Sequence, residues 1–313
     1  MVHRLGRHLL PAGDAPSHCQ AGGRAPTAAT RRRANDDAAD QARLRRRAAR
    51  ELNTRDSQRV LTGLMGLLAL CEYLSARPQA AASPWPTLAA TAPAFNLPPR
   101  DVLRAFGARP LLPGDAPDLY AALSDICARA RLHRVPELYL LPAPDMNAFA
   151  LGAPDNACIS ATQGLLRGLS RAEIGGILAH EVAHIVNHDT GAMNWAAAIQ
   201  NKIAGLAQHS VADLASCRER HAAFSLQSMF LASTPAIARL LFLAFSRLRE
   251  LDADALAVDL IDDPEALAVA LSKLERFHSG LSPWSAHLQH DARSRAWRSH
   301  PGTWERIWRM AGA

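Results

Sequence analysis

The 313-residue sequence predicts an α+β fold that is predominantly helical, with a small sheet beside one central helix. Three observations predict this class. Several segments, among them 119–132, 246–254 and 264–277, read as helices. Short apolar segments between residues 137 and 162 are flanked by Pro, Gly and Asp, which is typical of strands. A His-Glu-x-x-His pentapeptide, residues 180–184, lies within the helix whose start is most clearly marked.

Residues 1–50 are predicted to form a disordered, basic N-terminal arm. They contain 11 Arg, no Lys and four Asp, a net charge of +7, whereas the whole chain sums to +6. Few large apolar residues precede Leu44, so this arm has little to bury in a core. The Arg triplets at 31–33 and 45–47 could bind an anionic membrane surface or nucleic acid. A solvated tail is the simpler interpretation, and no specific nucleic acid partner is expected.

Residues 51–117 are predicted to form a helical segment followed by a Pro-rich linker, ahead of a domain at 118–313. The apolar segment Val60–Cys71 has 12 residues and ends at Glu72, which is short for a membrane span. No signal peptide is expected, because the start of the chain lacks a continuous apolar stretch. The chain is long enough for one large core with appendages.

Three short segments at 137–141, 147–150 and 157–162 are predicted to be strands. An edge strand near the central helix could pair through its main chain with an extended peptide, which gives affinity with little sequence preference. Strands that only build the core are an equally good interpretation. The residues considered for peptide pairing are Asn147, Ala148, Phe149 and Ala150.

The pentapeptide places two imidazoles and a carboxylate on one helix. His180 and His184 are four residues apart, so they share a face about 6 Å from each other and can bind one metal ion. Glu181 lies beside them, where it can act on a water activated by the metal. Upstream, Ser170 and Glu173 have the spacing of a capping box, which marks the start of the helix. The pattern favours metal-assisted hydrolysis.

A hydrolytic zinc site needs a third protein ligand. His188 is a poor candidate, because it would lie about 12 Å from His180 along one straight helix. Glu250 and Asp254 are four residues apart on a predicted helix and share a face. One carboxylate could bind the metal while the other accepts a hydrogen bond from the free ring nitrogen of a ligand His. The alternative is an exposed charged face paired with the neighbouring arginines.

The segment Met229–Phe245 leaves the membrane question open. It is 17 residues long but contains Pro235 and Arg239, so a marginal span, an interfacial helix and a buried core helix are all compatible with it.

The five cysteines are scattered and never in C-x-x-C spacing. They predict reduced thiols in a compartment that faces the cytosol. The segment Ser282–Ser294 is expected to be a loop.

Six segments in this order resemble the M48 family of zinc metallopeptidases, and within it the HtpX-like group. They include the N-A-F-A-x-G pattern, the metal helix, the S-R-x-x-E-x-x-A-D pattern and an H-P-x-x-E-R-I pattern near the C-terminus. The resemblance covers roughly residues 105–310. The segments are Met146–Gly152, Ala157–Leu166, Leu178–Ile185, Asn187–Asp189, Ser246–Asp254 and Ser299–Ile307.

The resemblance implies a zincin-like fold for the metallopeptidase domain at 118–313, and one Zn²⁺ per chain. It makes Glu250 the third ligand beside His180 and His184, and Asp254 the partner of a ligand imidazole. It implies endopeptidase activity on polypeptides with Glu181 as the general base, in the service of protein quality control. His300 becomes the candidate donor to the oxyanion.

Two further expectations follow from the resemblance. HtpX-like proteins usually carry transmembrane helices, so we expect membrane association with a catalytic domain that faces the cytoplasm, the alternative being a soluble cytoplasmic protein. The competing function is a catalytically silent adaptor that binds zinc or peptide at the membrane surface.

Overall fold

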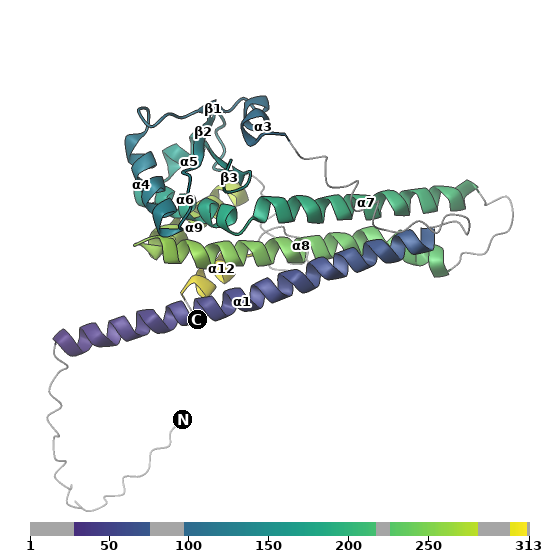
Figure 1. Cartoon of the computed structure of the whole chain (residues 1–313), viewed down its shortest axis with the longest axis horizontal. Coiled ribbons are helices and arrows are strands. Elements are labelled where there is room, and N and C mark those ends of the chain that lie inside the picture. The colour runs from purple at the N-terminus through teal and green to yellow at the C-terminus, as the bar shows by residue number, and fades with distance from the viewer. Residues whose placement is uncertain (1–27, 76–96, 217–225, 281–300, 312–313) are drawn as a thin grey trace, which may run out of the picture. The chain divides into compact units, whose positions relative to one another are not determined.

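The computed structural model describes residues 28–75, 97–216, 226–280 and 301–311 (Figure 1). His300 and the predicted loop at 282–294 lie outside these residues. The chain divides into two compact units, Met1–Asp40 and Gln41–Ala313. The helices are α1 Ala28–Ser75, α3 Pro99–Ala105, α4 Pro117–Arg129, α5 Gln163–Gly168, α6 Arg171–Val186, α7 Asp189–Ser216, α8 Leu226–Leu260, α9 Pro264–Gly280 and α12 Thr303–Met310. The strands are β1 Arg109–Pro110, β2 Glu137–Leu141, β3 Ala148–Leu151 and β4 Cys158–Thr162.

The four strands form one mixed sheet in the order β1-β2-β4-β3. The central pair, β2 and β4, is parallel, and the two outer pairings are antiparallel. All five residues of β4 are buried, whereas those of β3 are only partly buried at the sheet edge. The predicted strands thus form within about one residue of their expected bounds. The predominantly helical α+β class is confirmed.

Helix α6 lies at the centre of the main core, with 11 of its 16 residues buried. It packs on the sheet on one side and on α8 and α9 on the other. Gly176 permits the close approach of α9, since a Cβ at this position would lie 2.9 Å from Leu267 Cα. The central position of α6 explains why its buried face is wider than that of a surface helix.

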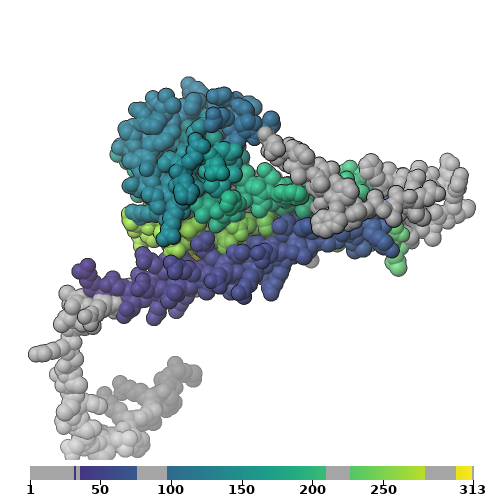
Figure 2. All heavy atoms as spheres, in the orientation of Figure 1, coloured from purple at the N-terminus to yellow at the C-terminus, as the bar shows by residue number. Residues whose placement is uncertain are grey.

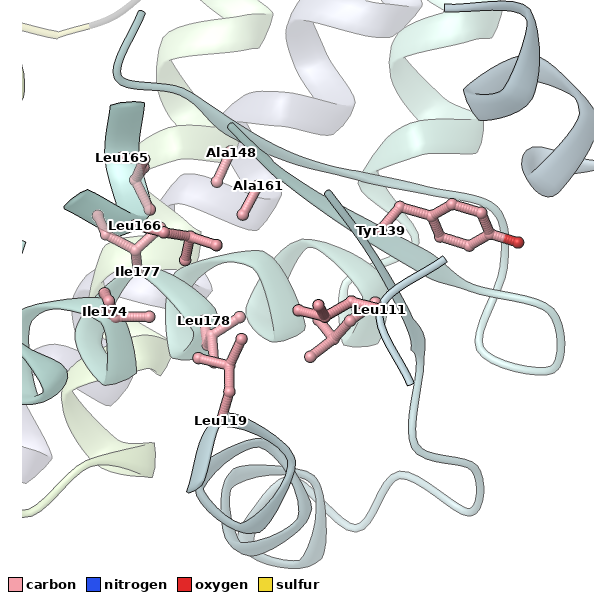
Figure 3. Close-up of a pocket in the computed structure, with 11 residues that line it drawn as sticks. Leu111, Leu119, Tyr139, Ala148, Ala161, Leu165, Leu166, Ile174, Ile177 and Leu178 are labelled. Atoms are coloured by element: carbon pink, nitrogen blue, oxygen red, sulfur yellow. The ribbon is translucent and has the colours of Figure 1, made fainter. Parts of the chain in front are cut away.

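A cavity of about 10 Å³ lies between the sheet and α6, and Figure 3 shows the residues that line it. Ala148 and Ala161 line it from the sheet, and Ile177 and Leu178 line it from the helix. The lining is apolar and the volume is close to that of a single water. This cavity is therefore a packing gap in the core and not a ligand site.

Helices α1, α7 and α8 share a second apolar core that lies apart from the sheet (Figure 1). Leu64, Leu68 and Cys71 of α1 are buried in it, together with residues such as Ile203 of α7 and Phe245 of α8. Helix α8 alone among the described helices is long and apolar enough to cross a membrane, and 33% of its most apolar 18-residue window is buried.

Residues 28–50 belong to helix α1, where the sequence predicted a disordered arm. Ala and Arg, both strong helix formers, dominate this part of the chain, and it contains no Gly or Pro. From Gln41 onward the helix also packs with the rest of its unit, which local composition does not reveal. The domain boundaries at 50 and 117 remain predictions.

Candidate metal centre

Helix α6 begins at the predicted capping box. Ser170 Oγ accepts a hydrogen bond from the main-chain N–H of Glu173 at 3.4 Å, and Ser170 N donates to Glu173 Oε2 at 2.8 Å. Lys273 of α9 adds an ion pair of 2.7 Å to Glu173 Oε1. These contacts satisfy the free N–H groups at the helix start and anchor the helix that carries the pentapeptide.

Three side chains from α6 and α8 converge on one point. His184 Nε2 lies 3.0 Å from His180 Nε2, and each of these nitrogens lies 3.6 Å from an oxygen of Glu250. Tetrahedral ligands at zinc distances of about 2.0–2.1 Å would be about 3.4 Å apart. Two imidazoles and a carboxylate at this separation form a possible metal site. Their donor types and spacing fit Zn²⁺.

His180 is held on its far side by Asp254 and Arg306. Its Nδ1 lies 3.0 Å from Asp254 Oδ1, and Arg306 of α12 donates two hydrogen bonds to the same carboxylate, at 2.6 and 2.7 Å. Burial disfavours the charged form of each group, but the pairing outweighs it. The pKa of Asp254 is lowered to about 2, and that of His180 is raised to about 10 by Asp254 and Glu250.

His184 is held in the same way by Asp189 and Arg249. Its Nδ1 lies 2.7 Å from Asp189 Oδ2, and Arg249 Nε donates to the other oxygen of Asp189. Arg249 Nη1 also donates to Asp252 at 2.9 Å. Asp189 can reach His184 because α6 ends at Val186 and His188 adopts a left-handed conformation, with φ of 57°. His188 serves the turn and does not join the three converging side chains.

The charges around the site leave a deficit of positive charge. Glu181 is buried beside the site and acts electrostatically on Arg306, whose pKa is raised by Asp254, Glu250 and Glu181 despite burial. Five carboxylates face two guanidinium groups here, which leaves a formal charge of −3 when both imidazoles are neutral. A divalent cation would offset most of this charge. The carboxylates are those of Glu181, Asp189, Glu250, Asp252 and Asp254, and the guanidinium groups are those of Arg249 and Arg306.

The residues considered for peptide pairing lie at the edge of the sheet beside α6. Ala148, Phe149 and Ala150 are in β3, and Asn147 directly precedes it. Asn147 is fixed by Thr162, whose Oγ1 accepts from Asn147 N at 2.9 Å and whose main-chain N–H donates to Asn147 O. Strand β3 pairs with β4 on one side, and no other described strand pairs with its second edge.

Sequence reasoning missed Asp189, Arg249 and Arg306 as part of this site. Asp189 and Arg306 fall within segments that carry the family resemblance, but no role was inferred for them. Arg249 was considered only as an ion-pair partner on an exposed face, yet just 11% of its side chain is exposed. Arg249 and Arg306 lie in helical segments rich in charged residues, and Asp189 lies at the start of α7, so no local signal in the sequence sets these three residues apart.

Comparison with known proteins gives a consistent result. The model of the family described as "Peptidase family M48" matches residues 113–312. A "Protease HtpX homolog" of Acaryochloris marina is 40% identical over 225 residues, which cover 66% of this chain and 76% of the relative. Proteins of the same name from Ralstonia nicotianae and Burkholderia mallei are each 32% identical, and the match covers 67% of this chain and 78% of each relative.

Proposed function

Because the chain belongs to peptidase family M48 and is a metallopeptidase, we propose that it is a zinc-dependent endopeptidase whose Zn²⁺ is held by His180, His184 and Glu250. The observation that carries this proposal is the convergence of the three donor atoms at 3.0–3.6 Å. Each imidazole turns its other nitrogen toward an aspartate, which fixes the tautomer that leaves Nε2 free for a metal.

A zinc ion at this point would lower the pKa of a water and polarise the scissile carbonyl. The chain's own contribution to the proton transfers is Glu181, which follows His180 on α6 and is buried at the site. Glu181 accepts the proton of the attacking water and delivers it to the leaving amine. Asp254 and Asp189 orient the imidazoles during these steps.

Substrate and oxyanion contacts complete the proposal. An extended polypeptide would pair with the second edge of β3, which brings its main chain beside α6. The contact residues would be those from Asn147 to Ala150. By its resemblance to the family pattern, His300 would donate a hydrogen bond to the oxyanion, a type of contact worth about 100-fold or more in rate.

We further propose that the protein is attached to a membrane, with its catalytic part facing the cytoplasm and a role in protein quality control. Arginines crowd the first half of α1, directly before its apolar half, and basic residues flank spans on the cytoplasmic side. The bundle of α1, α7 and α8 exposes large apolar side chains at its surface, among them Met65, Leu70, Trp195, Met229, Ile237 and Leu240. The segment proposed to enter the bilayer is 229–245.

Carbonate extraction of a membrane fraction tests the attachment. Retention in the pellet is expected for an inserted protein, and full release would rule out integral insertion. Binding to anionic liposomes by the full chain and by a chain without residues 1–40, the first compact unit, would measure what that part of the basic arm contributes.

Proteolysis of an unfolded substrate such as casein by the purified protein tests the enzymatic proposal. We expect activity that a chelator removes and added zinc restores. Glu181→Gln should lower the rate by about 10²- to 10⁴-fold, because the general base is lost, while zinc remains bound. A wild-type protein that binds zinc but cleaves nothing would support the silent adaptor instead. Cleavage by Glu181→Gln at the wild-type rate would overturn the mechanism.

A further inference from the structure

One face of α1 is polar in the middle of the helix and apolar toward its C-terminal end. Its middle part, residues 46–57, carries polar residues at intervals of four, three and four, which places them on a single helix face. The same face continues into the apolar core shared with α7 and α8. Asn53 and Ser57 are buried, and Arg46 and Arg50 are partly buried, although each lies on a long, otherwise charged helix. We call these four residues, Arg46, Arg50, Asn53 and Ser57, the polar stripe of α1.

The arginines of the polar stripe contact the end of α6, beside the metal centre, and helix α8. Arg50 Nη2 donates to Asn187 Oδ1 at 3.4 Å, across 137 residues of sequence. Asn187 is the C-cap of α6 and lies between His184 and Asp189. Arg46 pairs with Asp259 on α8 at 3.0 Å. Figure 2 shows the segment 41–75 of α1 lying along the α8 side of the same unit.

The stripe also meets the contacts that hold His184. Burial raises the pKa of Asp252, and Asn53 and Arg50 act electrostatically in the opposite direction by favouring its charged form. Asp252 is 2% exposed and accepts a hydrogen bond from Arg249. Arg249 in turn donates to Asp189, which contacts His184 Nδ1. An electrostatic link from α1 to Asp252, followed by direct contacts through Arg249 and Asp189, therefore leads to a proposed metal ligand.

Charge explains why Arg50 is needed in this series. Asp189 and Asp252 are both buried and share one guanidinium group, that of Arg249. Arg50 supplies the second positive charge. Without it, Arg249 alone would have to compensate two buried carboxylates, and its hold on Asp189 would weaken.

We propose that Arg50 and Asn53 of the polar stripe are positioning residues of the metal centre, which act through Asp252 and Arg249 to orient Asp189 and His184. This inference rests on the proposed zinc site. It gives these two residues a role in metal affinity that is separate from the packing of α1 in the bundle.

The test measures zinc affinity and zinc release in the full chain by competition with a chromogenic chelator. Partners of a metal-ligating histidine typically contribute 10- to 100-fold in affinity, and Arg50 lies beyond such a partner. We therefore expect Arg50→Ala and Asn53→Ala to weaken zinc binding by about 3- to 10-fold and to speed its release. Arg50→Lys should keep most of the affinity, because the charge remains.

Two arginines of the same helix provide matched controls. Arg47 is exposed, and Arg47→Ala should leave zinc affinity unchanged. Arg46→Ala removes the ion pair with Asp259 from the same stripe, and it should lower thermal stability without changing zinc affinity. If α1 had a purely structural role, Arg46→Ala and Arg50→Ala would change zinc affinity to the same extent.

A double-mutant cycle separates coupling from general destabilisation. In an Asp252→Asn background, the carboxylate that needs Arg50 is gone, so Arg50→Ala should change zinc affinity much less than it does in the wild type. Zinc binding by Arg50→Ala and Asn53→Ala that equals that of Arg47→Ala would overturn the inference alone. A wild-type chain that binds no zinc would overturn the proposed function and the inference with it.

Discussion

The two sides of the metal centre have the same kinds of contact, from imidazole to aspartate to arginine, but the arginines come from different parts of the chain. On each side an imidazole faces an aspartate, and the aspartate is held by an arginine. On the His180 side the arginine comes from the short C-terminal helix α12. On the His184 side it comes from α8, the helix that also carries Glu250.

The two sides also differ in the further contacts that each arginine makes. Arg306 ends its series with two hydrogen bonds to Asp254, and both side chains are below 10% exposure. Arg249 divides its donors between Asp189 and Asp252, and the series continues through Asp252 to α1. On the His180 side the contacts of Arg306 stay within the metal centre, at Asp254 and 3.6 Å from Glu250, whereas on the His184 side the interactions continue to the N-terminal helix.

The largest effect is expected when the pair of Arg306 and Asp254 is broken. Arg306→Ala would leave Asp254 buried without its cation, and loss of one partner of a buried pair typically costs about 3–5 kcal/mol. Arg249→Ala should cost less, because Arg306 compensates three carboxylates, those of Asp254, Glu250 and Glu181, whereas Arg249 compensates two, one of which Arg50 also stabilises. Chemical denaturation of both variants in the metal-free state measures the difference. A greater loss of stability in Arg249→Ala would contradict the comparison.

A smaller effect is expected on zinc affinity when each aspartate is replaced by its amide. Asp254→Asn and Asp189→Asn keep the size of the side chain but lose the charge that orients the imidazole, and such changes lower affinity by about 10- to 100-fold. The His180 side chain is 8% exposed and that of His184 is 16% exposed, so water can substitute more readily on the His184 side. Chelator competition at neutral pH should give a loss of affinity near 100-fold for Asp254→Asn and near 10-fold for Asp189→Asn. Equal zinc affinities of the two variants would contradict the expected difference between the His180 side and the His184 side.

The smallest effect is expected at Glu173, an ion-paired carboxylate that touches neither side. Burial opposes its ionisation, but hydrogen bonds from Lys273 and Ser170 outweigh this and lower its pKa. Its contribution to stability is therefore present above the ordinary carboxyl pKa and is lost as the pH falls through the lowered value. Glu173→Gln should cost about 1 kcal/mol at neutral pH, with zinc affinity unchanged.

Denaturation of Glu173→Gln and wild type across the acid range provides the check. The two stabilities should converge as the pH falls, since both side chains are then uncharged. A stability difference that persists unchanged in acid would show that the charge of Glu173 is not what anchors α6.

Much of the fold was predictable from local pattern. The capping box at Ser170 and Glu173 forms as expected, because both residues act within one helical turn. Strand β2 occupies the predicted residues, since flanking prolines and apolar residues mark it. The helix at residues 28–50, where the sequence predicts a disordered arm, was harder to predict. A polar, Arg-rich helix without an apolar stripe resembles a disordered arm until its partner is known.

The sequence by itself determined that His180, Glu181 and His184 share a helix, because helical spacing is a local property. It also put Glu250 and Asp254 on one face of a second helix. Only the tertiary structure decided which arginines donate hydrogen bonds to the two aspartates. Arg306 meets Asp254 across 52 residues, Arg249 meets Asp189 across 60, and Arg50 meets Asn187 across 137. Pairing at such separations depends on how whole helices pack, and helix packing is not encoded in the spacing of neighbouring residues.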